Sequence, residues 1–232
     1  GMHFHMELIR NGVNQIRNGD GLSQVAKQCI GGLCEYAGTL SAFGNTIPSS
    51  YFRLVPNQES PTQVFWSDLN RSALIRVPLG WSLGEDMAPY VNTQLKEHYR
   101  TKYIRQTFEL RSPDGSAFIH LLLSGITKII YNTFNDPEKY IKIAEERYLE
   151  PGKGIESVSL RSLPKTCWEA AEYLEIDRKI FGKDIPQEVL DWVIKHLKAS
   201  EDKDLLSSLS DLSPKEKAAR RLQIMHESFH IQ

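Results

Sequence analysis

Residues 1–8 are Gly-Met-His-Phe-His-Met-Glu-Leu, and their side chains alternate in the manner of a β-strand. Side chains two residues apart lie on one face of a strand, so His3 and His5 share a face, about 7 Å apart along the backbone. Two imidazoles placed in this way can bind a metal ion or contact a phosphate. The spacing also fits, and by itself favours, two exposed or hydrogen-bonded histidines. We expect the chain to begin inside a structural element.

The composition is that of a globular protein with one large domain or two small ones. The 232 residues include 28 Lys and Arg against 29 Asp and Glu, and 41% are hydrophobic. A net charge of −1 without a basic run argues against a general nucleic-acid or anionic-membrane binder. No run reaches the roughly 18 apolar residues that span a bilayer, and no signal-peptide pattern is present. The three cysteines lack metal-binding spacing, so we expect reduced thiols in a cytoplasmic protein; they are Cys29, Cys34 and Cys167.

Apolar periodicity and turn residues divide the chain into an expected α+β order. Strands are expected at residues 2–9, 64–66, 73–78 and 103–110, and helices at 22–44 and 117–134, the latter central and buried. Three later helices have clear start signals at Asp136-Pro137, at Thr166 with Glu169, and at Ser213-Pro214 with Glu216. Residues 45–61 form a long loop of the kind that often carries function. The segment 199–211 is the best linker candidate.

Four arginines lie near the ends of predicted strands or in loops. The planar guanidinium suits carboxylate or phosphate, so these arginines fit an anionic substrate. Surface salt bridging is the alternative, and scattered arginines commonly serve that role. The four residues are Arg53, Arg71, Arg76 and Arg111.

Two glutamates and a terminal motif complete the candidates. Glu59 lies in the long loop, where a mobile carboxylate can accept a proton or shield an intermediate. Glu109 lies between Phe108 and Leu110, so it needs a partner, which is either a bound cation or an arginine. Residues 226–230 match H-E-x-x-H, but the match ends at the C-terminus without a third ligand, so we do not expect a zinc protease at His226 and His230.

Taken together, these stretches resemble the glutamine synthetase family. Residues 1–8 resemble its G-M-H-x-H strand, residues 45–61 (NTIPSSYFRLVPNQESP) its substrate loop, and residues 70–78 (NRSALIRVP) its N-R-S-A-x-I-R-x-P motif. Residues 108–114 (FELRSPD) are similar to its E-x-R-x-P-D strand. The segment from Leu163 to Ala171 resembles its late L-P-x-x-L-x-E-A-L stretch. The motifs keep the family's order and spacing.

The resemblance implies an α+β fold, with an antiparallel sheet backed by helices, and a set of site residues. His3 and Glu109 would bind the metal that bridges the nucleotide phosphates, Mg²⁺ or Mn²⁺, and His5 would lie beside the phosphates of ATP. The glutamate substrate would be held by Arg53 and Arg111. Neutralisation of the transferring phosphoryl group would fall to Arg71 and Arg76, and Glu59 would belong to the flap that shields the intermediate and helps to deprotonate ammonium.

The implied reaction joins glutamate and ammonia at the expense of ATP, through γ-glutamyl phosphate. In the family, an amino-terminal domain and acidic strands with further metal ligands precede the first motif. We therefore expect residues 1–198 to be the carboxy-terminal part of a catalytic domain, followed by a helical tail at 199–232, and we expect the chain alone to be incomplete and inactive. A separate chain that carries the amino-terminal half would complete the enzyme, and the chain could also form a homo-oligomer. The alternative is a non-catalytic remnant or an interaction subunit of a split ligase.

Overall fold

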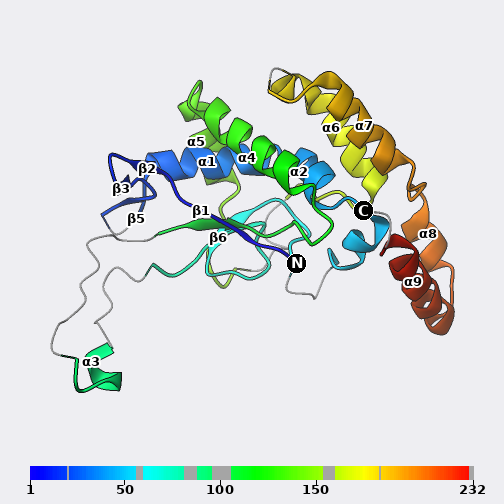
Figure 1. Ribbon diagram of the computed structural model, residues 1–232, viewed down its shortest axis with the longest axis horizontal. Coiled ribbons are helices and arrows are strands. Elements are labelled where there is room, and N and C mark those ends of the chain that lie inside the picture. The colour runs from blue at the N-terminus through cyan, green and yellow to red at the C-terminus, as the bar shows by residue number, and fades with distance from the viewer. Residues whose placement is uncertain are drawn as a thin grey trace.

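The computed structural model describes residues 1–19, 21–55, 60–80, 88–95, 106–153, 160–182 and 184–229. Glu59 and His230 lie outside these ranges, as do residues 103–105 of the last predicted strand. The described part is a mixture of helices and small sheets (Figure 1), which confirms the expected α+β class.

Four short strands from distant parts of the chain form the main sheet, in the order β1-β8-β7-β6. Two hairpins follow the first strand, β2–β3 and β4–β5, and Asn11-Gly12 between β2 and β3 has positive φ at both positions, as a tight hairpin turn requires. The strands are β1 (Phe4–Met6), β2 (Ile9–Arg10), β3 (Val13–Asn14), β4 (Arg17–Asn18), β5 (Gly21–Leu22), β6 (Trp66–Asp68), β7 (Ile75–Val77) and β8 (Phe108–Leu110).

One strand pair departs from the expected antiparallel order. β8 is antiparallel to both β1 and β7, but β6 and β7 run parallel. The chain between β6 and β7 reverses direction at Leu69, whose φ is 60°, and returns so that the backbone N–H of Leu74 donates to the carbonyl of Phe65. This return lets a short connection start β7 beside the beginning of β6.

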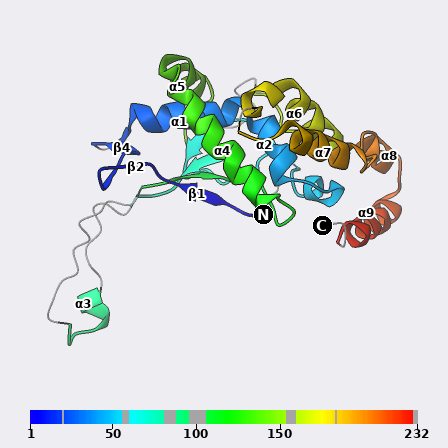
Figure 2. The same cartoon turned by 45° about the horizontal axis from the view of Figure 1, so that its top comes forward.

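Helices cover one side of the sheet and continue beyond its end (Figures 1 and 2). Within the described ranges, no helix combines the length and hydropathy needed to cross a membrane. The helices are α1 (Gln24–Glu35), α2 (Ala37–Gly44), the 3₁₀ helix η1 (Pro48–Phe52), α3 (Ala88–Val91), α4 (Ile119–Thr133), α5 (Pro137–Glu146), α6 (Cys167–Phe181), α7 (Gln187–Lys198), α8 (Leu205–Ser210) and α9 (Pro214–Ser228).

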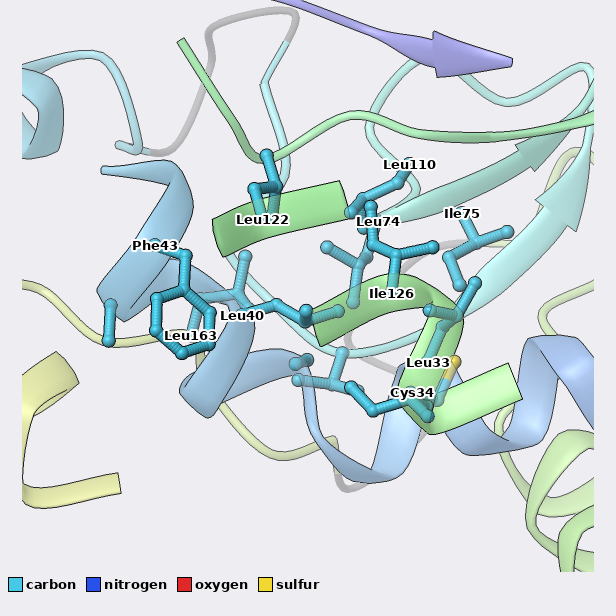
Figure 3. Close-up of a cluster of buried hydrophobic side chains, with 14 of the residues drawn as sticks. Leu33, Cys34, Leu40, Phe43, Leu74, Ile75, Leu110, Leu122, Ile126 and Leu163 are labelled. Carbon is cyan, nitrogen blue, oxygen red and sulfur yellow. The ribbon is translucent and has the colours of Figure 1, made fainter. Parts of the chain in front are cut away.

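The hydrophobic core lies between the sheet and α1, α2 and α4 (Figure 3). Ile75 and Leu110 of the sheet face the same cluster as Leu33 of α1 and Ile126 of α4. The expectation that residues 117–134 form a central, buried helix holds for one face only. One face of α4 is buried, whereas Ile119 on the opposite face is 46% exposed, because no described element covers that face.

The helix boundaries follow local capping chemistry. Asp136, Thr166 and Ser213 each accept a backbone N–H at the start of a helix, which confirms the three predicted starts. The predicted helix at 22–44 is instead two helices, α1 and α2, which meet at Tyr36. Its apolar periodicity continues through the junction, and this continuity hides the break from sequence reasoning.

The segment expected to be a linker is not a free one. It contains α8, and Asp202 within it is buried against the start of α6. The Asp202 carboxylate accepts the backbone N–H groups of Cys167 and Trp168 at 2.7 and 3.0 Å. The division of the chain at residue 198 remains a prediction.

Candidate functional site

Three strands place charged side chains side by side on the sheet face that points away from the helices. In the strand register, His5 of β1 and Arg76 of β7 both lie opposite Glu109 of β8. The neighbours of Glu109 in β8, Phe108 and Leu110, point into the core because side chains alternate between the two faces. The pleat that buries the core therefore assembles the polar cluster.

Glu109 is the centre of this cluster and is completely buried. One carboxylate oxygen lies 2.7 Å from Nε of Arg76 and 3.0 Å from Nε of Arg111. The other lies 2.7 Å from Nε2 of His5, and Nδ1 of His3 lies 4.0 Å from the carboxylate. Both histidines thus approach the same carboxylate, as their two-residue spacing predicts.

Among the described residues, one carboxylate of the cluster faces two arginines. Glu109 is ion-paired with two arginines, so the arginine alternative foreseen for this buried carboxylate holds in the described structure. Its two oxygens are nevertheless without a partner in hydrogen-bond geometry among the described residues. Guanidinium groups are suited to carboxylate and phosphate, so two arginines held side by side are compatible with an anion at this face.

Arg111 is buried and is tied to the turn that precedes β7. Its guanidinium donates to the carbonyl oxygens of Arg71 and Ala73. Arg71 is itself exposed in this turn. The backbone of Arg71 therefore belongs to the framework of the cluster, and its side chain lies at the surface.

Arg53 joins the site from the end of η1. Its Nη2 donates to the carbonyl oxygens of Ser112 and Pro113, at 2.5 and 3.2 Å, just after β8. The Gly1 backbone lies beside the same guanidinium, since a side chain at Gly1 would come within 2.9 Å of Nη1. Arg53 and Arg111 thus lie near one end of β8.

Burial changes the proton affinity of two of these side chains. Desolvation lowers the pKa of His3, with a further lowering by the nearby Arg111 charge and an opposing effect of Glu109. Desolvation also lowers the pKa of Arg53, partly opposed by Asp114. A neutral His3 is the form that ligates metal ions.

The donor set only partly fits the divalent metal implied by the family. His3 and Glu109 can both face one ion, and the unsatisfied carboxylate oxygens of Glu109 are suitable hard donors. However, the part of the chain that the structure describes has no group of three His, Cys, Asp or Glu residues arranged so that they could hold a metal ion. These two residues would form part of a metal site and need further ligands.

A separate cavity of about 900 Å³ lies on the opposite, helix-covered side of the sheet, and it does not include the cluster. Trp66 and Tyr148 form its aromatic wall, with ring centroids 4.5 Å apart.

The described cluster does not contain the remaining candidates from the sequence. Glu59 lies outside the described residues, so its place on a flap remains a prediction. His226 is exposed on α9, and its partner in the H-E-x-x-H match is not described. The three cysteines are buried, and none forms a disulfide in the structure.

The protein has an α+β fold, with helices on one face of a mixed sheet and a buried carboxylate among arginines and histidines on the other. The chain belongs to the glutamine synthetase family, because the model of the glutamine synthetase catalytic domain matches residues 1–214. This confirms the resemblance carried by the sequence motifs.

Individual relatives agree with the family match. The chain is 33% identical to a glutamine synthetase of Pyrococcus horikoshii over 185 residues, which cover 78% of this chain and 36% of the relative. The chain is also 33% identical to a glutamine synthetase of Thermotoga maritima over 208 residues, which cover 83% of this chain and 42% of the relative. It is 37% identical to a glutamine synthetase of Halobacterium salinarum over 182 residues, which cover 76% of this chain and 36% of the relative.

The fold agrees as well. A Plasmodium falciparum glutamine synthetase solved by electron cryomicroscopy superimposes with a TM-score of 0.61 at 19% identity, over 92% of this chain and 45% of that one. The chain spans about a third of the length of the first curated relatives it matches.

Proposed function

We propose that this chain forms the carboxy-terminal part of a glutamine synthetase-type catalytic domain and contributes its anion-binding face to the ATP-dependent joining of glutamate and ammonia. The observation that carries the proposal is the set of two arginines and two histidines around buried Glu109. Such a cluster is suited to phosphate and carboxylate groups, which this reaction brings together. The cytoplasm as its location stays a prediction.

In this proposal the arginines neutralise the charge of the first step, in which a substrate carboxylate attacks the γ-phosphate of ATP. Arg76 is partly exposed beside the buried pair of Glu109 and Arg111, so its remaining N–H groups can reach a phosphoryl oxygen. The side chain of Arg71, exposed one turn away, would add a second positive charge. Arginines held in place before the reaction stabilise the developing charge without reorganising.

The remaining residues would bind the substrates and protect the intermediate. His5 would lie beside the ATP phosphates, and Arg53 with Arg111 would hold the carboxylates of glutamate at the end of β8. Mg²⁺ or Mn²⁺, held in part by His3 and Glu109, would supply further neutralisation of the phosphate charge. Glu59 would belong to the flap that excludes water, since water would otherwise hydrolyse an acyl phosphate before ammonia attacks it.

Nucleotide binding tests the proposal directly. We expect calorimetry to detect binding of Mg·ATP to the purified chain, and Arg76→Ala to weaken it about 10-fold, the size of one lost charge-assisted contact. Arg76→Lys should keep part of the affinity because it retains the charge. Arg178→Ala is the matched control, because Arg178 lies on α6 and pairs with Asp191.

Two results would contradict the proposal. One is a folded wild-type chain that does not bind Mg·ATP, and this result would favour the non-catalytic interaction protein. The other is equal affinity of the wild type and Arg76→Ala. Glutamine formation by the chain alone would instead remove the expectation that a separate polypeptide completes the enzyme.

A further inference from the structure

The last helix, α9, packs on the segment that carries Arg53. α9 begins at Pro214, where the match to the family domain ends. In Figures 1 and 2 it lies beside the light-blue segment around residue 50, which is η1, and direct contacts join the two elements. An element outside the family match thus supports a loop inside it.

The inner face of α9 has helical spacing. Ile224 and Ser228 are buried, and Arg221 is half-buried one turn earlier on the same side. The helix start is held by a capping box between Ser213 and Glu216. The buried face of α9 is thus the one that carries Arg221, Ile224 and Ser228.

Arg221 makes the specific contact between the two elements. Its guanidinium lies over the Phe52 ring, 5.3 Å from the ring centroid, which is the geometry of a cation–π interaction. The Nε atom of Arg221 is buried and has no hydrogen-bond partner among the described residues. The Phe52 ring thus contacts one face of the Arg221 guanidinium.

Phe52 immediately precedes Arg53, and the rest of η1 is fixed from the other side. Tyr51 donates from its hydroxyl to the carbonyl of Asn45 at 2.9 Å, and Ser50 bonds to Ser116 at 3.0 Å. Since the inner side of η1 is anchored to the domain and Phe52 is covered by Arg221, the backbone leading into Arg53 is held from both sides.

We propose that Arg221 is a positioning residue for Arg53. By holding Phe52, it keeps η1 in the conformation that directs the Arg53 guanidinium toward the loop after β8. The consequence for glutamate binding rests on the proposed function, whereas the consequence for the order of η1 does not. α9 is then a part of the substrate-binding apparatus that the family domain does not include.

Hydrogen exchange of the full chain, followed by mass spectrometry, tests the structural step. We expect Arg221→Ala to raise amide exchange in η1 about 3- to 10-fold, the factor expected for one lost cation–π contact. Arg221→Lys should restore most of the protection, and Arg220→Ala, on the exposed side of the same helix turn, should leave it unchanged. Phe52→Leu should raise exchange to the same extent as Arg221→Ala, and the double variant should show no further increase, because both changes remove one contact.

Glutamate affinity in the presence of Mg·ATP tests the functional step, with a similar fold-loss expected in Arg221→Ala and in Phe52→Leu. The inference would be overturned if amide exchange in η1 were as slow in Arg221→Ala as in the wild type. It would also be overturned if the effects of Arg221→Ala and Phe52→Leu added up in the double variant. Loosened η1 with unchanged glutamate affinity would also overturn it. A wild type that binds no glutamate would refute the proposed function instead, while the exchange results would still decide the contact.

Discussion

The carboxylate of Glu109 lies 2.7 Å from Nε2 of His5, and the two residues face each other in the register of β8 and β1. The same carboxylate is 2.7 Å from Nε of Arg76 on the other neighbouring strand. Three strands that are far apart in sequence are thus joined on one face through a single buried acid. Its removal should affect folding as well as binding.

We expect Glu109→Gln to lower the free energy of unfolding by about 3–5 kcal/mol, because it removes the negative charge that pairs with the buried Arg111 guanidinium. Urea denaturation measures the change. Glu145→Gln is the control, since Glu145 is exposed and its pair with Lys27 is 3.7 Å long. A loss equal to that of the control would show that Glu109 is dispensable for stability.

We expect Asp202→Ala to destabilise the protein by about 1–3 kcal/mol, because two N–H groups at the start of α6 lose their acceptor. Thermal unfolding followed by circular dichroism reports the change. The matched variant Asp204→Ala alters an exposed residue two positions later and should have little effect. Equal melting curves for the two variants would contradict the capping role.

We expect Gly31→Ala to cost about 3 kcal/mol or more, because a Cβ at Gly31 would lie 1.8 Å from the carbonyl oxygen of Tyr140. A backbone atom of α5 cannot move away as a side chain can, so α1 and α5 would have to separate. Gly115→Ala offers a comparison, since a Cβ there meets nothing within 4 Å. Denaturant midpoints should differ clearly between the two variants.

Buried thiols should make stability fall at alkaline pH. Burial raises the pKa of the Cys34 thiol from 9.0 to about 12. Between these values the unfolded chain loses a proton that the folded chain keeps, so stability is full below pH 9 and decreases as pH rises toward 12. Near pH 10.5 the decrease from one thiol is about 2 kcal/mol.

Cys34→Ala isolates this effect. The variant loses stability at neutral pH because its core packing is poorer, but its unfolding free energy should fall less steeply than that of the wild type between pH 9 and 10.5. Parallel curves in urea titrations at several pH values would show that the thiol is not the titrating group.

Local chemistry in the sequence predicted a good part of this structure. Residues His3 and His5 share a face because a strand has a two-residue period, and Asp136, Thr166 and Ser213 cap helices because their side chains reach backbone groups three residues on. From the family motifs we expected Arg53, Arg76 and Arg111 to belong to one site, and in the structure all three lie around β8.

The misses have a common physical origin in contacts between distant residues. Asp202 caps a helix that begins 35 residues earlier, so no local pattern marks it. The parallel pairing of β6 and β7 depends on the turn at Leu69, a residue that rarely has positive φ. The apolar run of α4 does not reveal that one of its faces, which carries Ile119 and Leu123, is exposed.

The alternation of β7 and β8 has a consequence for how the protein assembles. Ile75 and Arg76, like Leu110 and Glu109, are neighbours in sequence but point to opposite faces of the sheet. A pairing error of one residue would therefore drive a guanidinium into the hydrocarbon interior and push an isoleucine into water. A misaligned pairing thus costs free energy both for the buried charge and for the exposed apolar side chain. Molecules that complete folding therefore also have the charged face correctly assembled.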